Sequence, residues 1–117
     1  MHIEEFRDYC LAKPFVTEGF PFDEYVLVFK VGGKIFALTN VEKFESINLK
    51  CDPEYAVELR ESYEAVEPGY HMSKKHWNTV RNSMDVDDPL LKELIDQSYA
   101  LVYKSLTKKV RDGLQNG

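Results

Sequence analysis

The sequence predicts an α+β fold, a single compact domain in which helices pack against an antiparallel β-sheet. Three observations lead to this prediction. Residues 25–40 contain two β-rich runs around an adjacent glycine pair, residues 46–51 alternate apolar and polar side chains, and Asp-Pro pairs precede two stretches with helical apolar spacing. The chain has 117 residues, of which 44% are apolar, and this suits one domain with a substantial core.

The glycine pair lies in "YVLVFKVGGKIFALTN", residues 25–40. Adjacent glycines suit a type I′ hairpin turn, because both central residues need a positive φ. With a two-residue turn, the pattern predicts a bulky face that packs under helices: Tyr25, Leu27, Phe29, Phe36 and Leu38. The opposite face, which includes Ala37, is smaller and only partly polar.

Three helices are expected from local signals. Residues 2–13 have apolar side chains at helical spacing, and the proline that follows would end this helix. The Asp-Pro pairs at 52–53 and 88–89 each combine an N-cap residue with proline at the first helical position. They predict helices over residues 53–63 and 89–106.

The remaining segments complete the expected domain. The alternation over residues 46–51 predicts a strand, and "HWNTV" at 76–80 is typical of a short one. The last six residues, "DGLQNG", suggest a frayed end. The domain is therefore expected to span residues 1–112, followed by a flexible tail at 113–117.

Charge is distributed unevenly along the chain. The formal net charge is −5, which argues against indiscriminate nucleic-acid binding, since such binding depends on Lys and Arg. Residues 52–68 carry six acids and one Arg, whereas residues 70–82 carry two Lys, one Arg and no acid. An anionic partner would therefore have to meet the second stretch and avoid the first.

Several classes of protein are excluded by missing patterns. No run approaches the roughly 20 apolar residues of a membrane span, and the start lacks a signal-peptide layout, so a cytoplasmic protein is expected. Cys10 and Cys51 do not form a CxxC pair; we expect both to be buried apolar residues, with a reactive thiol as the alternative. "VGGK" at 31–34 lacks the spacing of a phosphate-binding loop.

No catalytic or metal-binding constellation is evident. His71 and His76 are five residues apart and have no further partner at zinc-ligand spacing. "SLTK" at 105–108 matches the Ser-x-x-Lys pattern of acylating serines, but the companion motifs are absent. The sequence therefore predicts a protein that is not an enzyme and that uses neither a cofactor nor a metal ion.

The basic stretch "GYHMSKKHWNTV", residues 69–80, has two interpretations. In the first, its two lysines and Arg81 contact phosphates while Tyr70 or Trp77 stacks on bases. In the second, the stretch is a polar connector that leads into a core strand. The residues alone favour the second interpretation, because three charges are few beside the ~6–10 phosphate contacts of a committed DNA-binding protein.

Four blocks of the sequence together resemble the MmcQ/YjbR family of small bacterial proteins: "VLVFKVGGKIFAL", "INLKCDPE", "VEPGYHMSKKHWNTV" and "LIDQSYALVYKSL". They occur in the family's order and cover roughly residues 25–106. The resemblance implies a frataxin-like (CyaY-like) α+β arrangement. It also implies a predicted role in DNA binding through a double-wing motif, in which β-hairpins project as wings. The hairpin at residues 32–33 would be one wing.

Two hypotheses for function follow. The first is a small non-enzymatic bacterial binding module whose partner is double-stranded DNA. The residues assigned to this contact are Lys50, Lys74, Lys75, His76, Trp77 and Arg81. The second is a domain that binds another protein or a small ligand in a groove beside Tyr70, His71 and Trp77. Both hypotheses expect a monomer that does not bind membranes.

Overall fold

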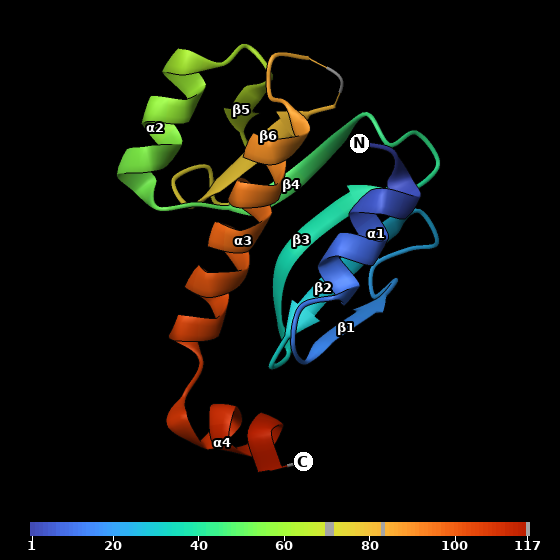
Figure 1. The fold of residues 1–117 in the computed structure, drawn as a ribbon, viewed down its shortest axis with the longest axis vertical. Helices are drawn as coiled ribbons and strands as arrows, with labels where there is room; N and C mark the ends of the chain where they lie inside the picture. Colours follow the sequence, from blue (N-terminus) through green and yellow to red (C-terminus); the bar gives the residue numbers. More distant parts are fainter. Residues whose placement is uncertain (70–71, 83, 117) are drawn as a thin grey trace.

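The chain forms an antiparallel β-sheet against which its helices pack (Figure 1). The computed structural model describes residues 1–69, 72–82 and 84–116. Its elements, in chain order, are α1 (Ile3–Leu11), β1 (Val16–Gly19), β2 (Val26–Val31), β3 (Lys34–Asn40), β4 (Ser46–Lys50), α2 (Pro53–Ser62), β5 (Val66–Pro68), β6 (Trp77–Arg81), α3 (Asp88–Ser105) and α4 (Lys108–Asn116). The strand order is β1-β2-β3-β4-β6-β5, and all neighbouring strands are antiparallel. The predicted α+β class is therefore confirmed.

Most of the predicted elements are present, with small shifts at their ends. The first helix, the hairpin at 32–33, β4 and β6 lie where the sequence places them. Asp52 caps α2 through its side-chain carboxylate, as expected. α3 begins one residue earlier than predicted, because Asp87 rather than Asp88 is its cap and accepts a hydrogen bond from the N–H of Leu90 at 2.9 Å.

Three elements were not expected. β1 and β5 are edge strands of four and three residues, and such short segments carry too few residues to show a periodic pattern. α4 is a further helix at the C-terminal end. It includes residues 112–116, which the sequence suggested as a frayed end.

A β-bulge in β3 changes the predicted register of the hairpin. The turn pairs as expected, but Phe29 then faces Ala37 rather than Phe36. Phe36 and Ala37 are consequently both fully buried on the side of the helices, since a bulge adds one residue to one strand. The prediction that Leu38 belongs to this bulky side is wrong, because the added residue turns Leu38 to the opposite face.

Ser98 of α3 bonds the backbone of two strands at the bulge. Its hydroxyl donates to the carbonyl oxygen of Phe36 at 2.5 Å and accepts from the N–H of Lys50 at 2.8 Å. The next residue of the helix, Tyr99, packs edge-on against the ring of Phe36, with centroids 5.3 Å apart. α3 is therefore fixed to the sheet where the register of β3 changes.

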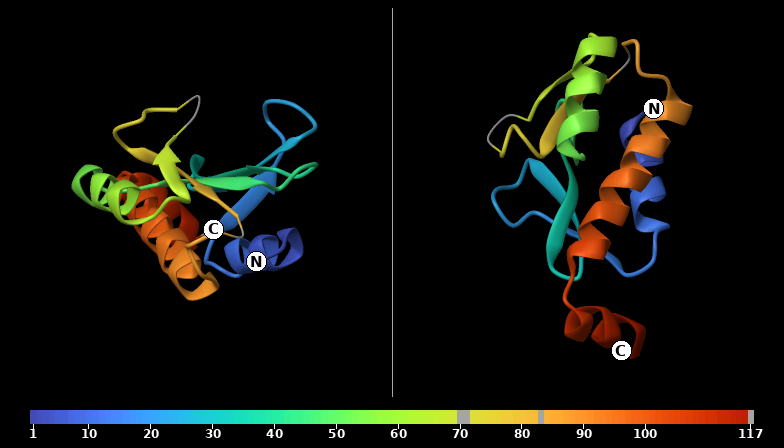
Figure 2. Two further views of the ribbon diagram at one scale, coloured as in Figure 1. Left: turned by 90° about the horizontal axis from the view of Figure 1, so that it is seen from above. Right: turned by 90° about the vertical axis from the view of Figure 1, so that its left-hand side faces the viewer.

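The two faces of the sheet differ in what covers them. α1 and α3 pack on one face, here called the helix face, and α2 packs on β5 and β6 at one end of the sheet. Phe6 of α1, for example, meets Phe29 edge-on at 5.4 Å. The opposite face, here called the open face, carries no helix; the left panel of Figure 2 shows two loops rising from it at opposite ends. The first loop comprises residues 20–25, and the described part of the second comprises residues 72–76.

The tip of the hairpin at residues 32–33 does not stand free. Gly32 has a φ of +59°, and a Cβ atom at this position would lie 2.6 Å from Leu106 and 3.1 Å from Val110. The hairpin tip is therefore packed against the start of the C-terminal region that contains α4. A role of this hairpin as a wing stays a prediction; two loops project from the open face (Figure 2).

Replacing Ser98 by alanine should destabilise the fold, because a buried carbonyl and a buried N–H lose their partner. We expect the free energy of unfolding to fall by about 1–3 kcal/mol, measured by urea denaturation. Ser105→Ala is the matched control, since the exposed Ser105 hydroxyl bonds only the carbonyl of Val102 in its own helix. This control should change the free energy by less than about 0.5 kcal/mol. Equal losses in the two variants would contradict the role given to Ser98.

Candidate binding groove on the open face

The floor of the open face is a continuous row of residues that crosses every strand. The register aligns one residue from each strand in spatial order: Gly19, Val28, Leu38, Asn48, Thr79 and Glu67. The row is apolar on β2 and β3 and polar on β4, β6 and β5. A ligand that lies across the strands would therefore meet an apolar half and a hydrogen-bonding half.

A groove of about 460 Å³ lies on this floor between the two loops. Its lining residues are Phe22, Val26, Leu38, Thr39, Asn40, Ser46, Asn48, Met72 and Thr79. Phe22 belongs to the first loop and Met72 to the second, so each loop supplies one wall. The volume falls within the ~300–1,000 Å³ that is typical of small-molecule sites.

The first loop is held in place where it joins β2. The carboxylate of Asp23 accepts hydrogen bonds from the N–H groups of Tyr25 and Val26, each at 2.8 Å. The carbonyl of Tyr25 accepts a further bond from the N–H of Val41 at 2.9 Å. Phe22 is therefore presented from an anchored loop, yet it is 66% exposed. An aromatic side chain that is this exposed has much apolar surface available for contact with a ligand.

The second loop is anchored from below by Arg60 of α2. The guanidinium donates to Asn78 Oδ1 at 2.7 Å and to the backbone carbonyl of Lys74. The carbonyl of His76 accepts from the N–H of Cys51 at 2.8 Å. These bonds tie the end of the loop to α2 and to the end of β4, so the wall that carries Met72 rests on a fixed base.

Hydrogen bonds inside the groove orient its amide side chains. Asn40 Oδ1 accepts from two backbone N–H groups of the turn that follows it, at 3.0 and 3.2 Å. Asn48 Oδ1 accepts from the hydroxyl of Thr79 at 2.7 Å. Asn48 Nδ2 lies 3.8 Å from Met72 Sδ, and a thioether sulfur is a weak acceptor. The amide oxygens are thus used by the protein, whereas the amide N–H groups are only weakly engaged within the described part of the chain.

Three of the residues predicted to contact nucleic acid lie on the open face. Lys50 pairs with Trp77 across β4 and β6, and Arg81 lies opposite Ser46. Arg81 Nε is also 3.1 Å from Glu67 Oε1. Because the guanidinium already forms an ion pair with this carboxylate, Arg81 is less available to a phosphate than the sequence suggested.

The other three predicted contacts belong to the second loop. Lys74 and Lys75 line a shallow depression together with Glu54 and Glu58 of α2. The acidic and basic stretches of the sequence are therefore neighbours in space, and the acids partly offset the lysine charges. His76, the third, is exposed. A contact between these residues and nucleic acid stays a prediction.

The sequence matches a known family over most of its length. A family model described as YjbR matches residues 11–101. The chain belongs to the YjbR family. It is 38% identical over 109 residues to YbdF of Escherichia coli O157:H7, which covers 92% of this chain and 89% of YbdF. It is 33% identical over 112 residues to YjbR of Escherichia coli K12, which covers 95% of each. Both relatives are described as uncharacterised proteins.

Solved structures share the fold of this YjbR-family chain. The crystal structure of Deinococcus radiodurans DR2400, described as a DUF419 domain, is similar at a TM-score of 0.91 and 40% identity, covering 97% of this chain and 88% of that one. The crystal structure of a Pseudomonas syringae protein gives a TM-score of 0.74 at 28% identity, covering 87% of this chain and 99% of that one. The family resemblance expected from the sequence is confirmed.

The sequence placed a groove beside residues 70, 71 and 77 of this YjbR-family domain, and most of the lining of the groove described above was not predicted. Tyr70 and His71, which were assigned to it, lie outside the described residues. Trp77 is on the open face but does not line the groove, whereas Phe22 does. The available signal was "FPFDEY" at residues 20–25, because several aromatics in a segment without strand or helix periodicity indicate exposed apolar surface.

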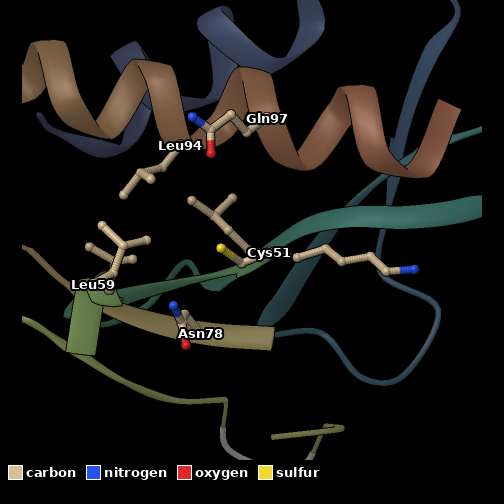
Figure 3. A pocket seen from close by; sticks show the side chains of 8 residues that line it. Cys51, Leu59, Asn78, Leu94 and Gln97 are labelled. Atoms are coloured by element: carbon tan, nitrogen blue, oxygen red, sulfur yellow. The ribbon is translucent and has the colours of Figure 1, made fainter. Parts of the chain in front are cut away.

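A second, internal cavity near Cys51 is too small for a ligand. Figure 3 shows the side chains around it, among them Leu59 from α2, Asn78 from β6 and Leu94 from α3. Its volume of about 10 Å³ holds one water molecule at most. Burial raises the pKa of the Cys51 thiol to about 11, so the thiol stays protonated at neutral pH. A protonated, buried thiol is a poor nucleophile.

The thiol of Cys10 is likewise a poor nucleophile. Burial raises the pKa of the Cys10 thiol to about 12, and this side chain is fully buried in the core. Across residues 1–69, 72–82 and 84–116, no three side chains of His, Cys, Asp or Glu are placed to hold a metal ion.

None of the described helices combines the length and the apolar character that a membrane crossing needs.

Proposed function

We propose that this chain is a non-enzymatic binding protein whose ligand occupies the groove of the open face. One observation supports the proposal most strongly: helices cover the opposite face, while the open face holds a walled groove with an apolar floor. Exposed apolar surface costs about 25 cal/mol per Å² relative to burial, and a contiguous exposed patch is typical of a binding site. Phe22, Val26, Leu38 and Met72 supply this surface.

The chemistry of the groove supports binding rather than catalysis. Its described lining offers apolar side chains, hydroxyls and amides. Acid–base and nucleophilic catalysis use an imidazole, carboxylate, amine or thiol, or a hydroxyl held beside such a base. None of the described lining residues carries an imidazole, carboxylate, amine or thiol. Amides and hydroxyls instead orient a bound ligand through hydrogen bonds.

The groove should bind Nile red, an uncharged dye whose fluorescence rises in apolar surroundings. Phe22→Ser removes one wall from an exposed position, so it should leave the fold intact and weaken dye binding about tenfold. Leu38→Lys, which places a charge on the floor, should act in the same direction. The measurement is a fluorescence titration of each purified variant.

Val57→Ser is the control for this titration. Val57 is similarly apolar and is 47% exposed, but it lies on α2 and does not line the groove. It should bind the dye as the unmodified protein does. Dye binding that is unchanged in both groove variants, or lost equally in the control, would place the binding surface elsewhere and overturn the proposal.

Double-stranded DNA is a second candidate partner, and the cations of the open face favour it. Lys30, Lys50 and Arg81 belong to this face, with Trp77 opposite Lys50. A duplex could meet them from the side on which the two loops project. Because Glu67 pairs with Arg81, binding would be weak and electrostatic.

If DNA is a partner, affinity for a fluorescent duplex should fall as salt rises. For three phosphate contacts, the drop between 50 and 200 mM salt is about 40-fold. The variant Lys30→Ala/Lys50→Ala/Arg81→Ala, which removes the three cations of the open face, should abolish binding measured by anisotropy at low salt. A variant with the same charge change, Lys104→Ala/Lys108→Ala/Lys109→Ala, should retain it. No binding by the unmodified protein at low salt would remove DNA from consideration.

A further inference from the structure

We infer that the ligand of the groove is an uncharged, planar aromatic molecule that carries a hydrogen-bond acceptor at one edge. The inference rests on the proposed function, because it names the ligand class for the same site. It follows from three properties of the lining, namely the apolar walls, the weakly engaged amide donors and the absence of charge from the described lining residues.

Apolar side chains from both loops and from the sheet line the groove. Phe22 forms one wall and Met72 the other, while Val26 and Leu38 lie on neighbouring positions of the floor. A phenyl ring prefers an offset-stacked or edge-on aromatic partner, and a thioether sulfur also packs well against an aromatic ring. A planar aromatic ligand could therefore pack favourably against both Phe22 and Met72. A flexible aliphatic chain would offer no aromatic ring to either side chain.

Two amide side chains of the groove, Asn40 and Asn48, present N–H donors. The two N–H groups that bond Asn40 Oδ1 fix the orientation of that amide, so its Nδ2 is left to donate. Asn40 Nδ2 has no partner among the described residues. The oxygen of Asn48 is likewise occupied by Thr79. A carbonyl oxygen or a ring nitrogen at the edge of a ligand would therefore match these amide donors.

The charge of the lining selects against ions. None of its described residues is Lys, Arg, Asp, Glu or His. Two charged residues beside it on the floor, Arg81 next to Ser46 and Glu67 next to Thr79, are paired with each other at 3.1 Å. Lys30 and Lys50 also belong to the open face but do not line the groove. An ionised ligand would give up hydration without meeting a counter-charge among the described lining residues, and such a transfer is unfavourable. The ligand is accordingly expected to be neutral.

Three probes with one aromatic body test this inference. They are 2-naphthamide, which is neutral and has a carbonyl acceptor, 2-naphthoate, which is an anion, and 2-naphthylmethylammonium, which is a cation. Each is titrated into methyl-labelled protein, and NMR shifts of Val26, Leu38 and Met72 report occupancy of the groove. We expect 2-naphthamide to shift all three methyl signals and to bind at least about tenfold more tightly than either ion.

Asn40→Asp tests the donor separately. An aspartate keeps the oxygen that the following turn needs, but it replaces the Nδ2 donor by an acceptor. 2-Naphthamide should bind about tenfold more weakly to this variant. Unchanged affinity would overturn the assignment of Asn40 as the donor that recognises the ligand.

The outcomes separate this inference from the proposed function. If an ion shifts the groove signals as strongly as the amide or more strongly, the groove binds ligands but the neutral class is wrong. If none of the three probes shifts Val26, Leu38 or Met72 at millimolar concentration, both the ligand class and the groove as a binding site are overturned.

Discussion

The contact on which the rest of the structure depends is the hydroxyl of Ser98 between β3 and β4. It bonds the carbonyl of Phe36 and the N–H of Lys50, and so holds α3 where the bulge shifts the register of β3. The bulge turns Ala37 under the helix and Leu38 to the other face. A single added residue thus converts an apolar core position into the floor of a groove.

Because the helices pack on one side of the sheet, this floor is left uncovered by helices. With α1 and α3 on the helix face, the open face is covered only at its ends by the two loops (Figure 2). Asp23 holds one loop, and Arg60 holds the other. Lys74 and Lys75 lie beside the acids of α2, so positive charge is offset at the rim while the groove itself stays neutral. The balance of forces at this face therefore favours apolar contact over electrostatic attraction.

Local signals in the sequence were sufficient for much of the fold. Asp52-Pro53 identified the start of α2, and the glycine pair at 32–33 identified the hairpin turn. The bulge has no local signal in the sequence, and Ser98, which bonds Phe36 there, is 62 residues away in the chain. Most of the groove lining was missed because its walls, Phe22 and Met72, are distant in the chain and are brought to one groove only by the order of the strands.

The most direct test compares the side chains of Ala37 and Leu38, which are adjacent in sequence. Methyl relaxation by a soluble, neutral gadolinium chelate measures how near each group lies to solvent. The account predicts strong relaxation of Leu38, which lines the groove, and little of Ala37, which is fully buried. The reverse pattern would mean a regular hairpin register with Leu38 in the core, and it would contradict the groove.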